Sequence, residues 1–316
     1  MKNRKKKLII GILIVLVLVL AAALGFIGNY FCNYALNPAV TNGIESDDDT
    51  DEKPDSADMV EAASWLSGEA EDIWMTSDDS LKLHAYKVDA KKPSNKYVVL
   101  CHGYKGEAAN MAIYGKHFYE SNYNILIPDA RAHGQSEGKL IGMGWPERRD
   151  IVKWVNTIVS DDESAQILLM GVSMGAATVM MTSGEEDLPS QVKAVVEDCG
   201  YTSVWDEFEY QLKEMFGLPS FPVLNVSSAV VKIRAGYFLR EASALKQIAK
   251  SHTPTLFIHG DQDTFVPYDM LDELYEAAAY EKEKLVIPGA AHGEARMTDS
   301  KTYWDAVDRF AKKYIK

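Results

Sequence analysis

Ser173 lies at the centre of the stretch GVSMG, which follows an apolar run at 167–170 and precedes a run of small residues at 176–180. The apolar run predicts a strand and the small residues predict a helix, so Ser173 would occupy a sharp turn between them. The two glycines of the stretch would permit the strained backbone and the close helix packing that such a turn requires. This context favours a nucleophilic serine over a serine that lies between two glycines by chance.

A candidate base for this serine lies near the C-terminus. A serine hydroxyl is a poor nucleophile until a base removes its proton, and a carboxylate commonly orients that base. Of the seven histidines, His292 lies in the small, glycine-containing loop PGAAHGE between the last predicted strand and the last predicted helix. His102 and His259 precede glycines at strand ends, and we expect them to hold loops in place. His292 is therefore the candidate base.

Three carboxylates follow predicted strands and could orient the base. The stretch FIHGDQDTFVP places Asp261 and Asp263 just past a strand end, on the face where open α/β sheets bind ligands. Asp198 follows another predicted strand and stays an alternative. The order Ser173, Asp263, His292 along the chain matches a known order of nucleophile, acid and base.

The elements that would position these residues alternate along the chain. Residues 73–75 and 81–88 predict an antiparallel pair. Short apolar runs predict buried strands at 97–100, 124–127, 167–170, 192–196, 255–258 and 285–287. Helical patterns lie between them, at about 107–120, 146–159, 174–184, 267–280 and 299–315. This alternation predicts an α/β fold, a mostly parallel central sheet with helices on both faces.

Residues 200–252 interrupt the alternation with several helical pieces and no strong strand, which predicts a helical lid inserted above the sheet. Its aromatic residues could line an apolar substrate pocket or form a small core of their own. They are Tyr201, Trp205, Phe208, Phe216, Phe221, Tyr237 and Phe238.

The N-terminus predicts a membrane anchor. Residues 1–7 carry five lysine and arginine side chains, and residues 8–28 carry no charge and are long enough to span roughly 30 Å of hydrocarbon. The flanking cations predict that residues 1–7 lie in the cytoplasm and that the following domain is extracytoplasmic. Cleavage as a signal peptide near Ala21–Ala23 is the alternative. Residues 29–69 are expected to form an acidic linker, with its acidic part at 37–58, before a domain at 70–316.

Composition excludes some classes of function. The formal net charge is −13 at pH 7, and beyond residue 7 there is no basic stripe that could hold nucleic acid. The three cysteines are odd in number and widely spaced, which argues against a zinc site and against a framework of disulfides.

Four motifs in order resemble the α/β-hydrolase superfamily over about residues 70–315, and within it the serine-aminopeptidase and monoglyceride-lipase-like group of membrane-anchored bacterial hydrolases. They are HGYKG at 102–106, DARAHGQS at 129–136, GVSMG at 171–175 and HGDQDTFVP at 259–267. The resemblance selects Asp263 as the acid, three residues before Val266. It also implies an oxyanion hole made by the backbone N–H groups of Tyr104 and Met174, with no metal or cofactor.

The second motif has a structural interpretation, in which Asp129, Arg131 and His133 pair around a tight turn. The resemblance implies a serine hydrolase of ester, thioester or amide bonds that acts through an acyl-enzyme, with a small-molecule, lipid-derived or peptide substrate. Ester hydrolysis is favoured. A peptidase of the serine-aminopeptidase type and a non-catalytic, membrane-anchored scaffold are the alternatives.

Overall fold

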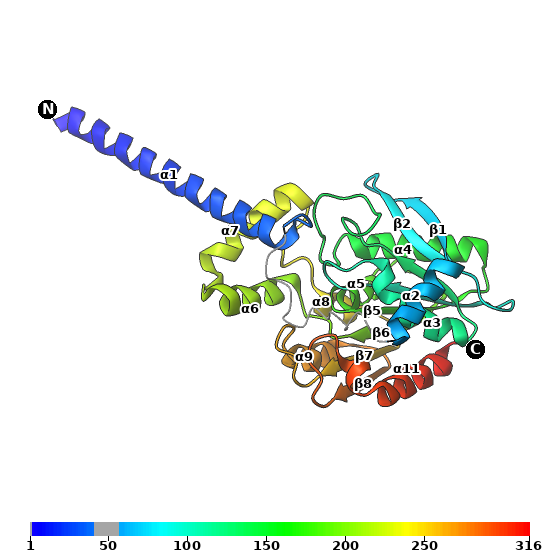
Figure 1. The fold of residues 1–316 in the computed structure, drawn as a ribbon. Helices are drawn as coiled ribbons and strands as arrows, with labels where there is room; N and C mark the ends of the chain where they lie inside the picture. The colour runs from blue at the N-terminus through cyan, green and yellow to red at the C-terminus, as the bar shows by residue number, and fades with distance from the viewer. Residues whose placement is uncertain (1, 41–56) are drawn as a thin grey trace.

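The computed structural model describes residues 2–40 and 57–316 and contains an α/β domain from which one long helix projects (Figure 1). This helix, α1 (Lys2–Leu36), carries the N-terminus away from the domain, and the C-terminus lies at the opposite end of the molecule (Figure 1). Within the described residues it is the one helix long and apolar enough to cross a membrane, from Arg4 to Leu36.

The sheet has eight strands in the order β1-β2-β4-β3-β5-β6-β7-β8. The strands are β1 (Glu71–Thr76), β2 (Lys82–Val88), β3 (Lys96–Cys101), β4 (Asn124–Pro128), β5 (Gln166–Val172), β6 (Val192–Asp198), β7 (Thr255–Gly260) and β8 (Lys282–Ile287). Strands β1 and β2 pair in antiparallel fashion, β2 is antiparallel to β4, and the remaining pairs are parallel. The predicted mostly parallel sheet is confirmed.

Helices cover both faces of this sheet. They are α2 (Ala57–Glu69), the 3₁₀ turn η1 (Ala108–Met111), α3 (Ala112–Glu120), α4 (Glu147–Asp161), α5 (Met174–Ser183), α9 (Asp269–Ala277), α10 (Ala295–Thr298) and α11 (Ser300–Tyr314). Alternate residues of a strand point to opposite faces. In β3, Val98 packs with residues of α3 and α11, whereas Val99 packs with residues of α4 and α5. Burial on both faces explains why the central strands are continuous apolar runs.

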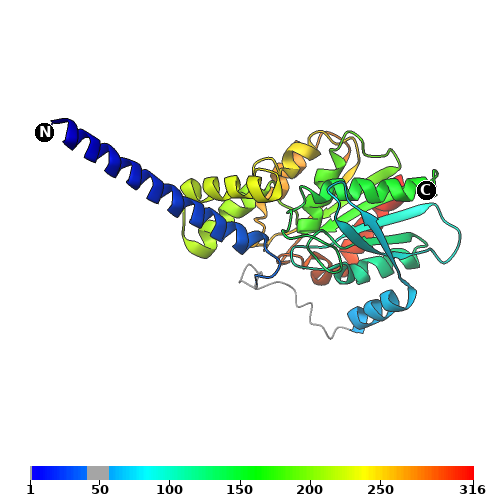
Figure 2. The same ribbon diagram turned by 90° about the horizontal axis from the view of Figure 1, so that it is seen from above.

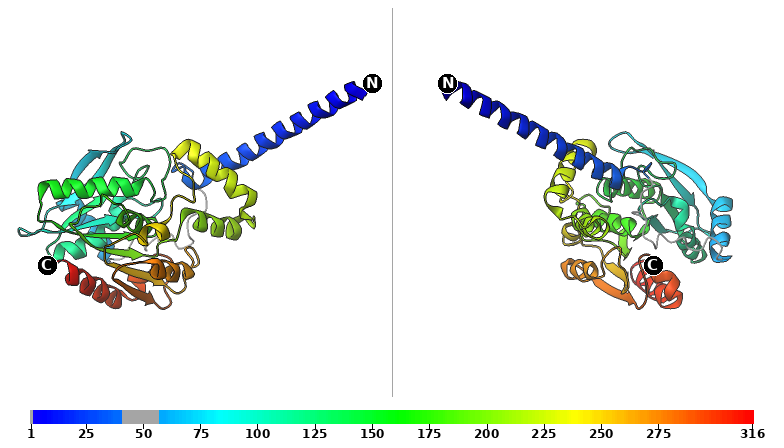
Figure 3. Two further views of the ribbon diagram at one scale, coloured as in Figure 1. Left: turned by 180° about the vertical axis from the view of Figure 1, so that it is seen from behind. Right: turned by 60° about the vertical axis from the view of Figure 1, so that its left-hand side comes forward.

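Three helices lie between β6 and β7, the interval in which the sequence shows helical pieces and no strong strand; we call them the insertion, and their role as a lid stays a prediction. They are α6 (Val204–Phe216), α7 (Ser220–Ala235) and α8 (Ala244–Ile248). Ser203 caps α6 by accepting a hydrogen bond from the Asp206 N–H, and Gly217 ends the helix in the left-handed conformation at φ 64°. Helices α6 and α7 extend beyond the sheet toward α1 (Figures 2 and 3).

The predicted acidic linker at 29–69 is wrong at both of its ends, and residues 41–56 lie outside the described residues. Residues 29–36 continue helix α1, because their apolar side chains pack against the insertion, with Cys32 and Leu36 buried. Residues 57–69 form α2, because Ala62 and Leu66 bury an apolar stripe in the core that also contains residues of α3.

Candidate active site

Ser173 occupies the sharp turn between β5 and α5. Its φ of 55° and ψ of −118° are strained for a residue with a side chain. The flanking glycines allow close packing: a Cβ added to Gly175 would lie 2.0 Å from the Cys101 carbonyl oxygen, and one added to Gly171 would lie 2.2 Å from the Gly175 backbone. The turn therefore has the geometry that its sequence predicts.

Ser173, His292 and Asp263 come together from three separate loops. His292 Nε2 lies 2.8 Å from Ser173 Oγ, and His292 Nδ1 lies 2.7 Å from Asp263 Oδ2. All three side chains are nearly buried, and the His292 ring lies beside the Phe265 ring. With Nδ1 as the donor to the carboxylate, Nε2 is free to accept the Ser173 proton.

Asp263 is held as a carboxylate. Its Oδ1 accepts hydrogen bonds from the N–H groups of Phe265 and Val266, each at 2.9 Å. His259 Nε2 lies 3.1 Å from Oδ2. Burial alone would raise the pKa of Asp263, but the charges and hydrogen bonds of His292 and His259 lower it to about 2. Asp263 is therefore ionised at neutral pH.

The two alternative acids, Asp261 and Asp198, form hydrogen bonds with groups other than His292. Asp261 is exposed and accepts hydrogen bonds from the Gly289 N–H at 2.7 Å and from Gln262. Asp198 Oδ2 accepts the Tyr303 hydroxyl proton at 2.8 Å, and burial raises the pKa of Asp198 to about 6. Among these three carboxylates, the hydrogen bond to His292 is made by Asp263.

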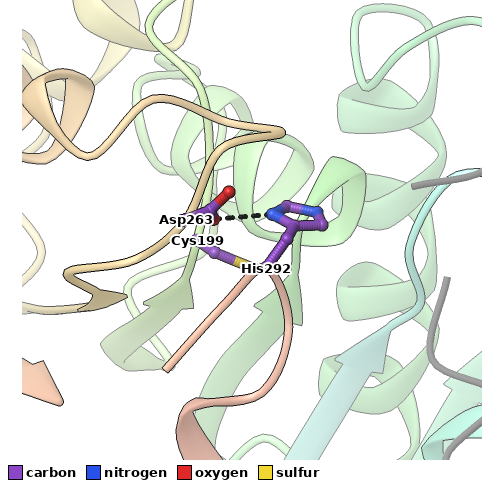
Figure 4. Close-up of side chains that lie close together, drawn as sticks. All are labelled: Cys199, Asp263 and His292. Atoms are coloured by element: carbon purple, nitrogen blue, oxygen red, sulfur yellow. Dashed lines mark hydrogen bonds and ion pairs between the residues drawn. The ribbon is translucent and has the colours of Figure 1, made fainter. Parts of the chain in front are cut away.

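Cys199 lies beside the imidazole and the carboxylate (Figure 4). Its Sγ and the ligand atoms of Asp263 and His292 lie within 4.8 Å of one another, a set that could in principle hold a metal ion. Metal ligation requires a thiolate, whereas burial raises the pKa of the Cys199 thiol well above its usual value. Asp263 also already engages Nδ1 of His292. These properties fit a neutral thiol that packs against the histidine.

Tyr104 and Met174, the predicted oxyanion-hole residues, border the same cavity as Ser173. Met174 is the first residue of α5, so its N–H has no partner within the helix. The loop after β3 passes close to Ser173, since a Cβ added to Gly103 would lie 3.6 Å from Ser173 Cβ. The two backbone segments that the resemblance implies are thus brought together beside Ser173.

Two histidines hold this loop after β3. His102 Nδ1 donates to the Gly103 carbonyl oxygen at 2.7 Å, and its Nε2 accepts from the Ala130 N–H at 3.0 Å. His133 Nε2 accepts from the Lys105 N–H at 3.1 Å. Burial, followed by the neighbouring His102, lowers the pKa of His133 to about 3, so its ring stays a neutral acceptor. The loop-holding role predicted for His102 is confirmed.

The side chains of Asp129, Arg131 and His133 do not pair with one another, and the predicted pairing is confirmed only for His133 Nδ1, which donates to the Arg131 backbone carbonyl oxygen at 3.0 Å. Asp129 instead accepts from His84 Nδ1 at 2.7 Å and from the Ala108 N–H at 2.7 Å. Arg131 reaches Asp150 and Asp79, each at 2.8 Å. Their partners lie far away in sequence, which local spacing could not indicate. The side chains of the motif thus connect it to β2, η1, α4 and the turn between β1 and β2.

Replacing Arg131 by methionine should lower the free energy of unfolding by about 3–5 kcal/mol, because it leaves buried Asp150 and Glu147 without their cation. Lys153→Met is the matched control. Its 3.0 Å pair with Asp78 is exposed, so its loss should cost about 1 kcal/mol or less. Thermal and urea unfolding of both variants, followed by circular dichroism, would measure the difference. Equal losses would contradict the buried role of Arg131.

A narrow cavity of about 40 Å³ adjoins Ser173. Its lining includes Tyr201 and Phe208 from the predicted aromatic set. Trp205 and Tyr237 are buried in the core cluster to which Tyr201 also belongs, whereas Phe221 and Phe238 are exposed. Some of the aromatic residues thus take each of the two roles that the sequence left open, whereas Phe221 and Phe238 take neither.

Sequence analysis missed Glu207 of α6, which also lines this cavity. One oxygen accepts a hydrogen bond from Gln211, whereas the other, Oε2, is buried without a hydrogen-bond partner in the described residues. Burial raises the pKa of Glu207 to about 8, so the neutral form predominates at pH 7. Nothing in the local sequence distinguishes Glu207 from the exposed glutamates of the same helix.

The architecture is that of the α/β-hydrolase fold. The sheet has eight strands and is mostly parallel, Ser173 lies in the turn after β5, and an aspartate and a histidine follow β7 and β8. A family model described as "Serine aminopeptidase, S33" matches residues 92–216. The uncharacterized protein YqkD of Bacillus subtilis is 30% identical over 214 residues, 67% of this chain and 70% of its own length. The chain belongs to the α/β-hydrolase superfamily.

Further comparisons agree with this assignment. The α/β-hydrolase domain-containing protein WAV2 of Arabidopsis thaliana is 24% identical over 260 residues, 77% of this chain and 79% of WAV2. An esterase of Pyrococcus furiosus aligns with a TM-score of 0.63 and 24% identity, covering 80% of this chain and 94% of the esterase. An acylaminoacyl peptidase of Pyrococcus horikoshii aligns with a TM-score of 0.58 and 17% identity, covering 76% of this chain and 41% of the peptidase. The family supports a hydrolase activity.

Proposed function

We propose that this protein is a membrane-anchored serine hydrolase that cleaves ester bonds, with Ser173 as nucleophile, His292 as base and Asp263 as the orienting acid. The observation that carries the proposal is the continuous hydrogen-bonded chain from Ser173 Oγ through His292 to Asp263, beside a cavity. A non-catalytic scaffold has no need for this chain or for the strained turn at Ser173.

The proposed reaction has two halves. Ser173 Oγ attacks the ester carbonyl carbon while His292 Nε2 takes the hydroxyl proton. The backbone N–H groups of Tyr104 and Met174 stabilise the oxyanion, and the intermediate collapses with loss of the alcohol, which receives the proton from His292. Water then attacks the acyl-enzyme, gives a proton to His292, and releases the carboxylic acid as Ser173 recovers its proton.

The peptidase alternative has one observation in its favour. Glu207 places a buried carboxyl group in the cavity, where it could bind a substrate amine. Its pKa of about 8 leaves it mostly neutral at pH 7, which weakens its attraction for a cation and favours an ester substrate. Parallel assays with p-nitrophenyl esters and aminoacyl p-nitroanilides would decide between them: turnover of the anilides alone would overturn the ester proposal.

One labelling experiment tests the nucleophile and the orientation together. A membrane-impermeant fluorophosphonate should modify the full chain on intact cells that have been stripped of their wall, and peptide mass spectrometry should locate the adduct on Ser173. The reason is that α1, with its N-terminal cations, would leave the catalytic domain outside the cytoplasm.

This experiment distinguishes an error in the predicted orientation from an error in the predicted nucleophile. Labelling of Ser173 only after the cells are permeabilised would reverse the orientation and preserve the enzyme. No labelling of folded protein under either condition would contradict an activated serine and favour the scaffold alternative.

A further inference from the structure

The last two turns of α1 are built into the domain. Cys32 and Leu36 are buried, with exposed fractions of 2% and 0%. Arg234 of α7 donates hydrogen bonds to Asn29 Oδ1 at 3.0 Å and Asn33 Oδ1 at 2.7 Å. Helices α1 and α7 lie side by side in the ribbon views (Figures 1 and 2). The C-terminal end of the anchor helix therefore packs against the insertion and is held there by hydrogen bonds.

The C-terminal end of α1 also reaches the loop beside the nucleophile. The last four carbonyl groups of a helix lack partners within the helix. Here the Tyr104 hydroxyl donates to the Ala35 carbonyl oxygen at 2.6 Å, and the Ile141 N–H donates to the Leu36 carbonyl oxygen at 2.8 Å. Because Tyr104 belongs to the predicted oxyanion loop, α1 contacts the catalytic region directly.

A second cavity of about 40 Å³ lies between α1, α6 and α7. From α1 it is lined by Phe31, Cys32, Tyr34, Ala35 and Leu36. Most of the opposite wall is also apolar, and the Ser227 hydroxyl there is turned back to donate to the Val223 carbonyl oxygen at 2.8 Å. A lining of this kind suits an aliphatic group.

The two cavities adjoin across α6. Phe208 and Gln211 line both the cavity at Ser173 and the cavity at α1. Gln211 is fixed by hydrogen bonds to Glu207 and to the Phe265 carbonyl oxygen, each at 2.9 Å, so joining the two cavities would require the Phe208 ring to turn aside. Rotation of that ring would join the cavities into one apolar path that starts at the nucleophile.

We propose that this path binds the acyl chain of the ester and that the end of the anchor helix forms its far wall. The proposal rests on the proposed function, since the acyl carbonyl carbon must sit at Ser173 Oγ. One water-sized group needs about 10–15 Å³ of such volume, so each cavity holds about three to four, the two together hold about six to eight, and the path fits an acyl chain of up to about eight carbons. The anchor helix thus contributes to substrate selection as well as to location.

The test uses the full chain in lipid nanodiscs and p-nitrophenyl esters of 2, about 8 and about 16 carbons, the middle length being set by the cavities. Ala35→Leu and Ser227→Leu fill the α1 cavity from opposite walls, and neither removes the backbone contact to Tyr104. Each should lower kcat/KM for the octanoate about tenfold, through lost burial of about two methylenes, and leave the acetate unchanged. Ala23→Leu, on an exposed part of α1, is the control and should match the native chain.

The outcomes separate this proposal from the proposed function. Selective loss of the octanoate reaction in both filled variants, from a native chain that prefers octanoate to hexadecanoate, would support the acyl path. Equal loss of acetate and octanoate reactions, or no loss in either variant, would overturn the acyl path while the hydrolase stands. Absence of turnover of every ester, together with no fluorophosphonate adduct, would instead overturn the proposed function.

Discussion

Replacing Ser173 by alanine is expected to lower kcat/KM for every ester by about 10⁵-fold or more, to the level that binding and the oxyanion donors alone can sustain. The variant loses the atom that attacks the carbonyl carbon, while His292 and Asp263 keep their hydrogen bond. Alanine is the right replacement because it preserves the strained turn at φ 55°, whereas glycine would relax it.

The measurement is steady-state hydrolysis of p-nitrophenyl acetate by purified native and variant chains, with thermal unfolding to establish that the fold is kept. Ser67→Ala is the control, since Ser67 is exposed on α2 and, among the described residues, its hydroxyl makes a single long hydrogen bond, at 3.4 Å to the Ser64 carbonyl oxygen. Native-level turnover by folded Ser173→Ala would exclude Ser173 as the nucleophile.

The central sheet and the serine turn could be predicted from sequence because their determinants are local. An apolar run such as 167–170 has to be buried on both faces, and Gly171 is required by its contact with the Gly175 backbone four residues later, although Gly175 itself meets Cys101 at the end of β3, far away in sequence. The order of nucleophile, acid and base follows from the order of the strands. These features depend on periodicity and spacing, which a single sequence displays.

The C-terminal end of the N-terminal apolar helix could not be predicted in the same way. Composition distinguishes 8–28 as uncharged, but what continues the helix to Leu36 is its packing against α7 more than 180 residues later. Glu207 is a similar case, because its burial and its pKa depend on segments that meet only in the folded chain. Contacts of this kind have no local signature.

Asp263→Asn is expected to lower kcat by about 10⁴-fold with little change in KM. An amide can donate to His292 Nδ1 and so stabilise the tautomer that carries its proton on Nε2, which cannot accept the Ser173 proton. It also removes the negative charge that would stabilise the imidazolium formed during attack. The effect should be largest for Asp263 because its Oδ2 lies 2.7 Å from Nδ1 of His292.

Asp261→Asn is the matched control, two residues away on the same loop. Asp261 is exposed and its carboxylate is bound to the Gly289 N–H rather than to a histidine, so turnover should stay within about twofold of native, as for an ordinary surface substitution. Steady-state kinetics of both variants at pH 7 would measure the contrast. Loss of activity in Asp261→Asn with retention in Asp263→Asn would assign the acid to Asp261 and would require a rearranged loop. A large loss in Asp263→Asn alone would mean that the hydrogen-bonded chain from Asp263 to Ser173 carries the reaction.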